Sequence, residues 1–425
     1  MKPSAQRRSD IMIAAVFLGM LVLPGIVWLF EPATGYSARE GRKLVERPSF
    51  PRSLGALAMF PSQYETYVAE HVGLRDRLLA LEARLHLLLD DSPTPKVVVG
   101  RDGWLFLGES LNHHRNVGPV PEHRLQNWLA TQLANNRWLA TRGIPYFAVV
   151  VPDKHTIYGE FMPDRVRVLE SPTGFDAAVA ALEIRGNLDF IDLRRDLTKA
   201  KTKAQLYHKT DSHWNARGAD VAQHRIAIEL SRHFPTLRPV LYADSFDTIA
   251  VTGRGGGNAR MLYSSDHIRE FNVPVLRDPN YLCPTEPNAS PSFSVRGDCV
   301  TMSKRCERRP VENPLDLGDR PRLQYGDAFE MVCDDSPVDA TLLVFRDSFF
   351  SELVPFFSAY FTRTIYIWSP PKPEYRDFFV RAYAPDAVLY ERGEREAFPS
   401  PNVPGMMGYL SKQPAAGRKE AGPSR

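Results

Sequence analysis

Ser348 stands in a sequence context where a side chain could do chemistry. Residues 342–345 (LLVF) form an apolar run of strand length, and a helical pattern of apolar residues resumes after Ser348. A serine between a strand and a helix lies at the carboxyl end of the strand, where α/β sheets carry their reactive groups. Unpaired N–H groups at the helix start would also stabilise an oxyanion. Ser348 is therefore a candidate nucleophile; the competing interpretation is that Asp347 or Ser348 only caps the helix.

A second segment, residues 207–218, supplies an acid and a base. Asp211 and His213 are two positions apart, and in extended backbone positions i and i+2 point to the same side. The imidazole could then take the proton of a serine hydroxyl, while the carboxylate would fix the imidazole tautomer. The alternative is that Asp211 caps the helix that follows and that His213 is merely a polar neighbour.

Metal and nucleotide sites have weaker support. His208, Asp211 and His213 are ligand types that suit zinc, and His224 follows on the next helix. One extended loop seldom supplies three tetrahedral ligands, so we predict no metal site. The glycine-rich residues 253–262 (GRGGGNARML) lack both the GxGxxG pattern and the lysine of a P-loop. We therefore expect no cofactor.

The rest of the chain alternates between strand-like and helix-like segments. This alternation predicts an α/β fold with a doubly wound, mainly parallel sheet. Strands are expected at residues 146–151, 188–193, 341–345, 363–368 and 387–390. Helices are expected at residues 124–142, 174–184, 220–234, 348–360 and 374–382. Upstream, residues 60–90 have helical periodicity, and residues 97–106 indicate two strands joined at a Gly-containing turn.

Charge and the N-terminal residues limit the class of protein. With 53 Lys and Arg against 50 Asp and Glu, the net charge of +3 leaves no basic excess of the kind that nucleic-acid binders carry. Residues 11–30 form an uncharged apolar stretch long enough to span a bilayer, and Lys2, Arg7 and Arg8 precede it. The positive-inside rule then places the N-terminus in the cytoplasm and the remaining chain across the membrane. A cleaved signal peptide is the alternative, but residues 31–35 make a poor cleavage site.

The cysteines cluster in one segment of the chain. Cys283, Cys299, Cys306 and Cys333 are the four cysteines of the sequence. In an oxidising compartment this clustering predicts two disulfides in a loop-rich insertion, with three possible pairings. Zinc is the rival interpretation, but the sequence has no CxxC pair and the spacings are irregular. The cysteines therefore agree with a location outside the cytoplasm.

Several motifs together resemble those of a known family. They are GRDGWLFL (100–107), VVPDKHTIY (150–158), TDSHWNARGA (210–219) and LLVFRDSFF (342–350). With the apolar N-terminal segment, this combination is similar to the SGNH-hydrolase-like O-acetyltransferases of alginate and other exopolysaccharide systems, the AlgJ/AlgX-like proteins. The resemblance extends over roughly residues 44–398. DxHW followed much later by DSF is specific as a pair, whereas each half alone is a weak signal.

The resemblance implies roles for three residues. Ser348 would be the nucleophile, His213 the general base and Asp211 the acid that orients the base. Ordinary SGNH hydrolases carry the serine first and the Asp/His pair last. Here the pair precedes the serine, as in the alginate proteins, whose topology is a circular permutation of the usual one. The triad chemistry is unchanged because it depends on geometry and not on chain order.

Further residues depart from the family pattern or are less clear. Arg346 replaces the glycine that usually precedes Asp-Ser, and its guanidinium would contact an anionic sugar or pair with a carboxylate. Asn258 could complete an oxyanion hole through its amide or could instead cap its loop. For Lys154 and Tyr158, at the carboxyl edge of the expected sheet, packing and substrate contact are both open. The cysteine-bearing residues 284–333 do not map onto the family.

These observations predict an organisation and a function. We expect, in order, a cytoplasmic N-terminus (1–10), a transmembrane anchor (11–30), a tether with a helical entry segment (31–95), an SGNH-like catalytic domain (96–398) with its cysteine-bearing insertion at about 280–335, and a disordered tail (399–425). The resemblance implies an inner-membrane protein, facing the periplasm, that passes an acetyl group through a serine ester to exopolysaccharide hydroxyls. A membrane-bound acyltransferase would supply the acetyl group. A carbohydrate acetylesterase with the same triad and a non-catalytic scaffold for polymer assembly are the alternatives.

Overall fold

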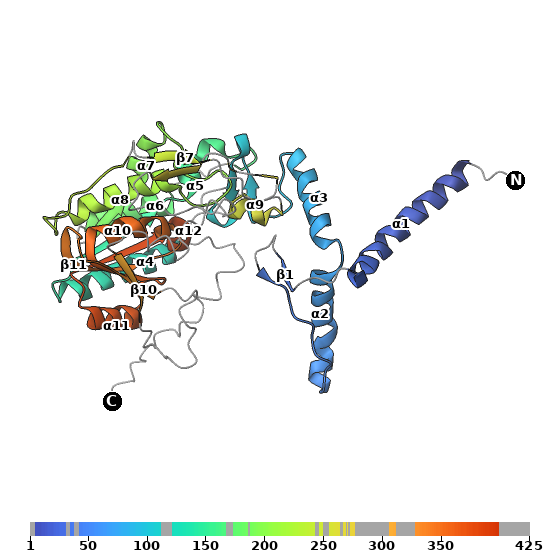
Figure 1. Cartoon of the computed structure of the whole chain (residues 1–425), viewed down its shortest axis with the longest axis horizontal. Coiled ribbons are helices and arrows are strands. Elements are labelled where there is room, and N and C mark those ends of the chain that lie inside the picture. The colour runs from blue at the N-terminus through green and yellow to red at the C-terminus, as the bar shows by residue number, and fades with distance from the viewer. Residues whose placement is uncertain are drawn as a thin grey trace, which may run out of the picture.

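The computed structural model shows a sheet-centred domain and three N-terminal helices that stand beside it (Figure 1). It describes residues 5–30, 35–37, 42–111, 121–166, 173–185, 188–242, 246–249, 255–263, 267–268, 270, 273–276, 306–311 and 328–398. The predicted tail, residues 399–425, lies outside the described residues.

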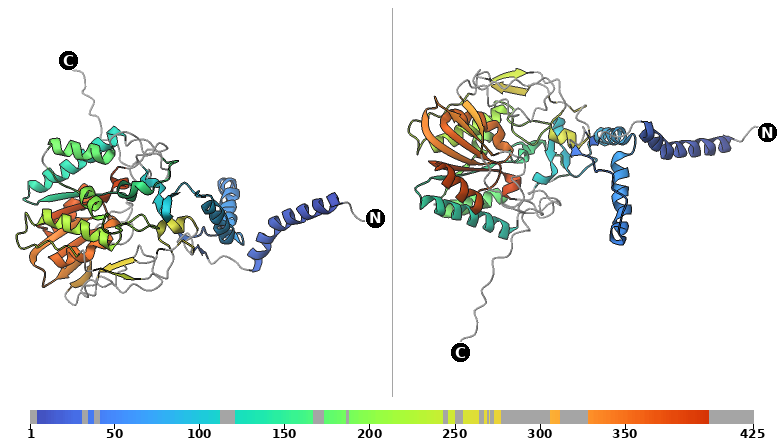
Figure 2. Two further views of the ribbon diagram at one scale, coloured as in Figure 1. Left: turned by 90° about the horizontal axis from the view of Figure 1, so that it is seen from above. Right: turned by 60° about the horizontal axis from the view of Figure 1, so that its bottom comes forward.

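A seven-stranded sheet forms the centre of the larger domain (Figure 2). Its strands follow the order β6-β5-β13-β11-β12-β10-β9. Their bounds are β5 Tyr146–Val151, β6 Asp189–Asp192, β9 Cys306–Pro310, β10 Ala328–Cys333, β11 Val338–Phe345, β12 Phe361–Ile367 and β13 Ala387–Gly393. The five strands from β6 to β12 run parallel to their neighbours, and β10 and β9 add an antiparallel edge. The predicted α/β fold with a mainly parallel sheet is confirmed.

Helices cover both faces of this sheet, because its central strands are apolar on both sides. Every residue of β5 is buried. Phe147 and Val149 pack into the apolar cluster that contains residues of α8 (Ala216–Leu230) and α10 (Val354–Tyr360). Tyr146 and Ala148 point the other way, into the cluster with α4 (Glu122–Ala140) and α11 (Pro373–Tyr383). A continuous apolar run such as YFAVVV is what a strand buried on two faces requires.

Three short helical segments begin where parallel strands end. α5 (Lys154–Tyr158) follows β5, the 3-10 helix η4 (Phe349–Leu353) follows β11, and α12 (Glu394–Ala397) follows β13. Because β5, β13 and β11 are adjacent and parallel, these three segments lie at one edge of the sheet. The predicted helix at residues 348–360 is therefore two pieces, η4 and then α10.

The remaining elements are short. They are β1 Tyr36–Ser37, β2 Arg42–Lys43, β3 Val97–Val99, η1 Arg101–Gly103, β4 Leu105–Leu107, η2 Gly108–Ser110, η3 Gly159–Phe161, α6 Gly174–Arg185, α7 Arg194–Ala200, β7 Phe246–Ile249, α9 Gly257–Met261 and β8 Val273–Leu276. β3 and β4 pair antiparallel around a turn in which Asp102 and Gly103 have φ of 53° and 78°. This is the Gly-containing hairpin that the sequence predicts, since positive φ favours glycine.

The N-terminal helices are α1 (Ala5–Phe30), α2 (Leu54–His71) and α3 (Arg75–Leu88). Within α1, Arg8–Phe30 is long and apolar enough to cross a membrane, and most side chains of this stretch are exposed. A membrane anchor and a signal sequence share this pattern. Gly73, between α2 and α3, packs against α1 so closely that a Cβ there would lie 2.5 Å from the Pro24 carbonyl oxygen. The apolar helix, together with the disulfide described next, indicates a location outside the cytoplasm.

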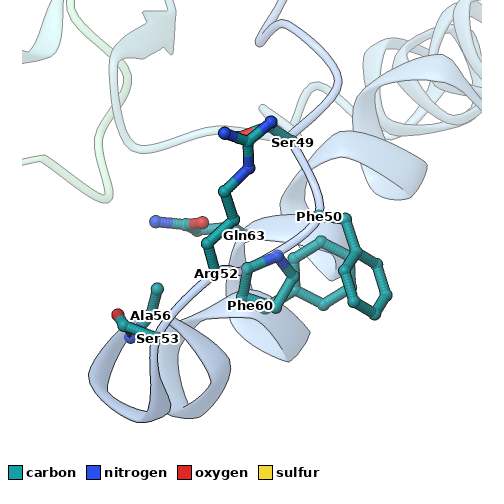
Figure 3. A pocket seen from close by; sticks show the side chains of 8 residues that line it. Ser49, Phe50, Arg52, Ser53, Ala56, Phe60 and Gln63 are labelled. Carbon is teal, nitrogen blue, oxygen red and sulfur yellow. Dashed lines mark hydrogen bonds between the residues drawn. The ribbon is translucent and has the colours of Figure 1, made fainter.

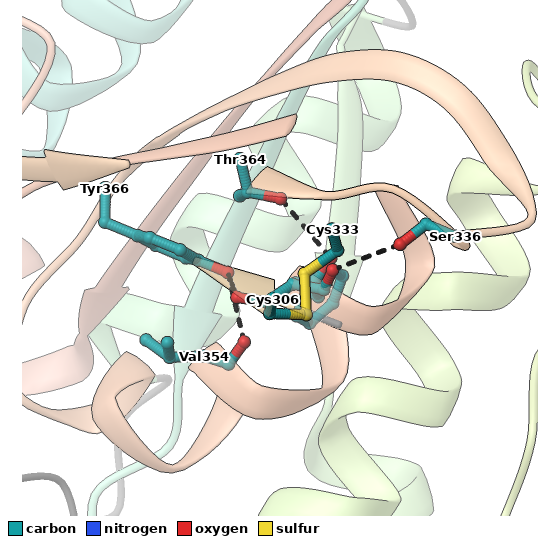
Figure 4. Close-up of a disulfide and its surroundings, with 8 residues drawn as sticks. Cys306, Cys333, Ser336, Val354, Thr364 and Tyr366 are labelled. Atoms are coloured by element: carbon teal, nitrogen blue, oxygen red, sulfur yellow. Dashed lines mark hydrogen bonds between the residues drawn. A yellow bond between two sulfur atoms is a disulfide. The ribbon is translucent and has the colours of Figure 1, made fainter. Parts of the chain in front are cut away.

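Two antiparallel strands, of which β9 is the edge strand, lie within the cysteine-bearing insertion. β9 and β10 pair antiparallel, and the disulfide between Cys306 and Cys333 joins residues that face each other across the two strands (Figure 4). The prediction of a loop-rich insertion is therefore wrong for these two segments. β9 (CERRP) has no alternation of apolar and polar residues, because it is an exposed edge strand, and so it gave no strand signal. Cys283 and Cys299 lie outside the described residues.

Candidate active site

Ser348, His213 and Asp211 form one hydrogen-bonded line. The Ser348 hydroxyl lies 2.7 Å from His213 Nε2, and His213 Nδ1 lies 2.6 Å from Asp211 Oδ1. With the Nδ1–H tautomer, the imidazole donates to the carboxylate and accepts from the serine hydroxyl. The Asp211 side chain is 3% exposed and that of His213 18%, so the acid is buried while the base reaches solvent. Residues 135 positions apart thus meet in the arrangement of a nucleophile, a base and an orienting acid.

The segment that carries the acid and base is a tight hairpin in front of α8. Tyr207 and Trp214 form an antiparallel bridge, and the His208 N–H donates to the His213 carbonyl at 3.1 Å. Asn215 caps α8, since its side chain accepts from the N–H groups of the first helical turn. The interpretation in which Asp211 caps this helix is therefore wrong. The cap frees the Asp211 carboxylate to face His213.

The hydrogen-bond partners of Asp211 favour the ionised form of its carboxyl group. Burial alone would raise its pKa, but the hydrogen bond and charge of His213 and the Gly257 N–H hold the pKa well below the usual range. The His213 N–H donates to Oδ1 at 3.1 Å and the Gly257 N–H to Oδ2 at 2.5 Å. Gly257 and Gly256 can approach this closely because neither has a side chain; a Cβ at Gly256 would lie 2.7 Å from the Cβ of Asp211. The glycine-rich loop therefore donates a hydrogen bond to Asp211, and its glycines allow the backbone to come this close.

Asp347 holds the backbone next to Ser348, the candidate nucleophile. One carboxylate oxygen of Asp347 accepts the Phe349 N–H at 2.8 Å, and the other accepts the Gly393 N–H at 2.7 Å. The side chain thus ties the start of η4 to the end of β13. The expectation of unpaired N–H groups at the helix start fails at Phe349, because Asp347 takes that donor. Burial and the adjacent Asp347 charge raise the pKa of Glu391, whose carboxyl accepts the Asp347 N–H at 3.1 Å.

Aromatic residues fix the contact between the two segments. The Phe349 ring lies 4.8 Å from the His213 ring and 5.4 Å from the Trp214 ring, measured between centroids. The Trp214 indole N–H donates to the Phe349 carbonyl at 3.1 Å, and Trp214 is fully buried. Trp214 of the DxHW motif and Phe349 of the DSF motif therefore join the segment of His213 to the segment of Ser348.

The four secondary site residues of the sequence analysis are all buried. The Asn258 amide donates to the Leu105 carbonyl at 2.9 Å, which attaches α9 to β4 and fits the loop-holding alternative. The Tyr158 hydroxyl accepts the Leu206 N–H at 2.9 Å, and burial raises the pKa of Tyr158 to about 12. Tyr158 therefore packs beneath the hairpin.

Arg346 lies two residues before Ser348 in the chain. Its guanidinium donates to the Ser351 hydroxyl at 3.2 Å and stacks over the Trp368 ring, with 4.6 Å from its central carbon to the ring centroid. The Arg346 residue is 4% exposed. Stacking on an aromatic face is a common use of arginine.

Lys154 contacts the backbone of residues 207–214, the hairpin that carries Asp211 and His213 and is called the triad hairpin below. Its ammonium donates to the carbonyls of His208, Lys209 and Asp211. Glu270, which sequence reasoning missed, accepts N–H groups of the same hairpin. No sequence motif identifies Glu270, because its partners Lys209 and Thr210 lie about 60 residues earlier in the chain and are brought to it only by the fold.

Other kinds of site have less support within the described residues. No group of three or more His, Cys, Asp or Glu side chains there is arranged to hold a metal. A hollow at the start of α2, lined by Phe50, Arg52, Phe60 and Gln63 among others, contains none of the predicted site residues (Figure 3).

Comparisons with known proteins agree with the motifs. Residues 97–256 match the family model described as SGNH hydrolase-like domain, acetyltransferase AlgX. The matched region contains Asp211 and His213, and Ser348 lies beyond it. The probable alginate O-acetylase AlgJ of Pseudomonas aeruginosa is 26% identical over 231 residues, which is 54% of each chain. The chain is thus similar to the AlgX model over residues 97–256 and to AlgJ over about half of its length.

A second AlgJ protein matches a shorter part of the chain. The probable alginate O-acetylase AlgJ of Pseudomonas putida is 28% identical over 150 residues, which is 35% of this chain and 38% of the relative. The chain thus spans about half the length, or less, of the curated AlgJ relatives. Among solved structures, the O-acetyltransferase domain of Pseudomonas putida AlgJ has 18% identity and a TM-score of 0.44, covering 74% of this chain and 96% of that one. Bacillus cereus PatB1 has 11% identity and a TM-score of 0.48, covering 71% and 97%.

Proposed function

We propose that this chain is an O-acetyltransferase that carries an acetyl group on Ser348 and delivers it to hydroxyls of an exopolysaccharide. The observation that carries the proposal is the line of hydrogen bonds from Ser348 through His213 to Asp211. Homology to the AlgX/AlgJ family supports acetyl as the group and a polysaccharide as the acceptor. Alginate is the polymer in the names of the AlgJ relatives.

The first half of the reaction loads the serine. Ser348 Oγ attacks the carbonyl carbon of an acetyl donor while His213 Nε2 takes the hydroxyl proton. The buried, ionised Asp211 stabilises the imidazolium that forms. When the carbonyl is restored, the bond to the leaving group breaks and His213 returns the proton to that group. The product is an acetyl ester of Ser348.

The second half of the reaction transfers the acetyl group from Ser348 to the sugar. A sugar hydroxyl takes the place of the leaving group, gives its proton to His213 and attacks the ester carbonyl. The bond to Ser348 Oγ breaks, and the serine regains its proton from the imidazolium. Because the partly exposed His213 faces solvent, water can compete with the sugar at this step. Transfer therefore requires that bound polymer exclude water from the ester.

The location and the donor belong to the same proposal. α1 anchors the chain in the inner membrane, and the catalytic domain faces the periplasm, where the disulfide between Cys306 and Cys333 is stable. The resemblance to the alginate proteins implies a membrane-bound acyltransferase as the partner that supplies the acetyl group across the bilayer. The exopolysaccharide is the acceptor.

The partition of the acetyl group tests transferase against esterase. With a chromogenic acetyl ester as donor and deacetylated alginate oligosaccharides as acceptor, we expect acetylated sugar to exceed free acetate, and the ratio to rise with acceptor concentration. The two products are measured by mass spectrometry and by an acetate assay. Release of acetate alone at every acceptor concentration would favour a carbohydrate acetylesterase. Absence of both products, with the folded chain in hand, would favour a non-catalytic scaffold.

A further inference from the structure

The triad hairpin is held from one side by a buried ammonium. Lys154 is 3% exposed, and its Nζ donates to three backbone carbonyls: His208 at 2.9 Å, Lys209 at 3.0 Å and Asp211 at 2.5 Å. Three carbonyls of one tight hairpin converge on this group because the chain turns around it. A single positive charge therefore fixes the direction of three peptide dipoles.

A buried carboxylate binds backbone N–H groups of the same hairpin. Glu270 is 8% exposed, and it accepts the Lys209 N–H at 3.0 Å and the Thr210 N–H at 3.1 Å. The Thr210 hydroxyl donates to the same carboxylate at 3.1 Å. In two peptide units, 208–209 and 209–210, the carbonyl thus faces the cation and the N–H faces the anion. Both ends of these two peptide dipoles are charge-paired.

We propose that Lys154 and Glu270 form an ionic clamp on residues 208–211 that positions Asp211 and His213 for proton transfer from Ser348. The inference rests on the proposed role of Ser348 as nucleophile. Neither clamp residue touches the reacting atoms, so both are positioning residues. A hairpin released by either partner would let the imidazole move away from the serine hydroxyl, and a displacement of about 1 Å at such a site costs on the order of 10²-fold in rate.

The clamp makes the site sensitive to alkaline pH. Burial lowers the pKa of Lys154 to about 7, against the opposing charges of Glu270 and Asp211. Glu270 stays ionised because its pKa falls to about 2: burial would raise it, but the His208 charge and hydrogen bonds lower it. The other charged group of the hairpin, Lys209, donates to the Asp102 carbonyl at 3.1 Å. As pH rises above about 7, the Lys154 ammonium loses its proton and the clamp weakens.

The test measures how fast Ser348 reacts with phenylmethylsulfonyl fluoride in the full chain. In this reaction Ser348 Oγ forms a bond to sulfur, fluoride leaves, and His213 takes the hydroxyl proton. Mass spectrometry follows the adduct on Ser348 with time. We expect Lys154→Met to label on the order of 10²-fold more slowly than the unmodified chain. The control is Lys199→Met, an exposed lysine of α7 outside the hairpin and the clamp, which should label at the unmodified rate.

The pH profile separates positioning from general damage. The unmodified chain should lose labelling rate as pH rises above about 7, and Lys154→Met should lack this alkaline loss because methionine has no proton to lose. Glu270→Gln should move the loss to lower pH, because the Glu270 charge raises the Lys154 pKa. If Lys154→Met does not fold, the Glu270→Gln profile decides alone.

The outcomes distinguish this inference from the proposed function. Equal labelling of Lys154→Met and the unmodified chain, or an alkaline loss that Glu270→Gln leaves in place, would overturn the clamp and leave the nucleophile intact. A folded, unmodified chain that is not labelled on Ser348 at any pH would overturn both.

Discussion

Replacing Ser348 with alanine is expected to lower the rate of acetyl transfer by a factor on the order of 10⁴ or more. The hydroxyl oxygen 2.7 Å from His213 Nε2 is the atom that forms the ester, and alanine has no atom to replace it. The fold should survive, because only the Oγ atom is lost from a side chain that makes no helix-capping hydrogen bond. Initial rates with a chromogenic acetyl ester, together with the thermal unfolding midpoint, measure the two effects.

The matched control for this variant is Ser336→Ala. Ser336 is a serine outside the site whose hydroxyl donates to the Ser358 carbonyl at 3.4 Å, near the disulfide (Figure 4). Its loss should leave the transfer rate within about twofold, since surface substitutions usually change little. An active, folded Ser348→Ala protein would remove the serine from the mechanism.

Asp211→Asn is expected to reduce the rate by a factor on the order of 10³ to 10⁴ with the fold intact. The carboxylate accepts three N–H groups, from the His213 ring, the His213 backbone and Gly257. An asparagine amide turned toward His213 Nδ1 would favour the tautomer with the proton on Nε2. That imidazole cannot take the serine proton. The loss should fall on kcat, because Asp211 is buried away from any substrate.

The dependence of the rate on pH, compared between the unmodified chain and its variants, gives a second test of the role of Asp211. The pKa of Asp211 lies well below its usual range, so the unmodified chain should show no loss of rate from Asp211 protonation at mildly acidic pH. Asp164→Asn is the control, since Asp164 is exposed and pairs with Arg101 at the surface. Rates of Asp211→Asn that match this control at every pH would argue that His213 does not act through Asp211.

The parallel sheet was predictable because its strands have strong local signals. Residues 146–151 form a strand with the predicted bounds, since six consecutive apolar and β-branched or aromatic residues suit only a fully buried strand. β11 and β13 also follow their apolar runs, and each extends beyond the predicted residues. The edge strand β9 was not predictable, because its charged residues carry no periodic pattern and its pairing depends on β10 and the disulfide.

The convergence of Ser348, His213 and Asp211 was predictable, and the groups around them were not. Ser348 follows a strand and Asp211 and His213 share a spacing, so residue type and position were enough to select them. Lys154 was selected from the sequence without a role, because its partners are backbone carbonyls, which no sequence motif identifies. Glu270 was missed for the same reason.

The chemistry depends on the edge where three adjacent parallel strands end. Ser348 follows β11 and Lys154 follows β5, while Gly393 at the end of β13 donates its N–H to the Asp347 carboxylate. The hairpin of residues 207–214 then lies over this edge through Trp214 and Phe349. A small change in any one of these contacts would move the imidazole relative to the hydroxyl, so the sheet and the hairpin together determine reactivity.

The most direct measurement is the identity of the acetylated residue after brief incubation of the full chain with a chromogenic acetyl ester. Acid quenching, proteolysis and mass spectrometry should find one acetyl group on the peptide that contains Ser348, formed before acetylated sugar appears and lost when acceptor is added. Acetyl transfer that proceeds with Ser348 unmodified, or with the acetyl group on another residue, would contradict the account.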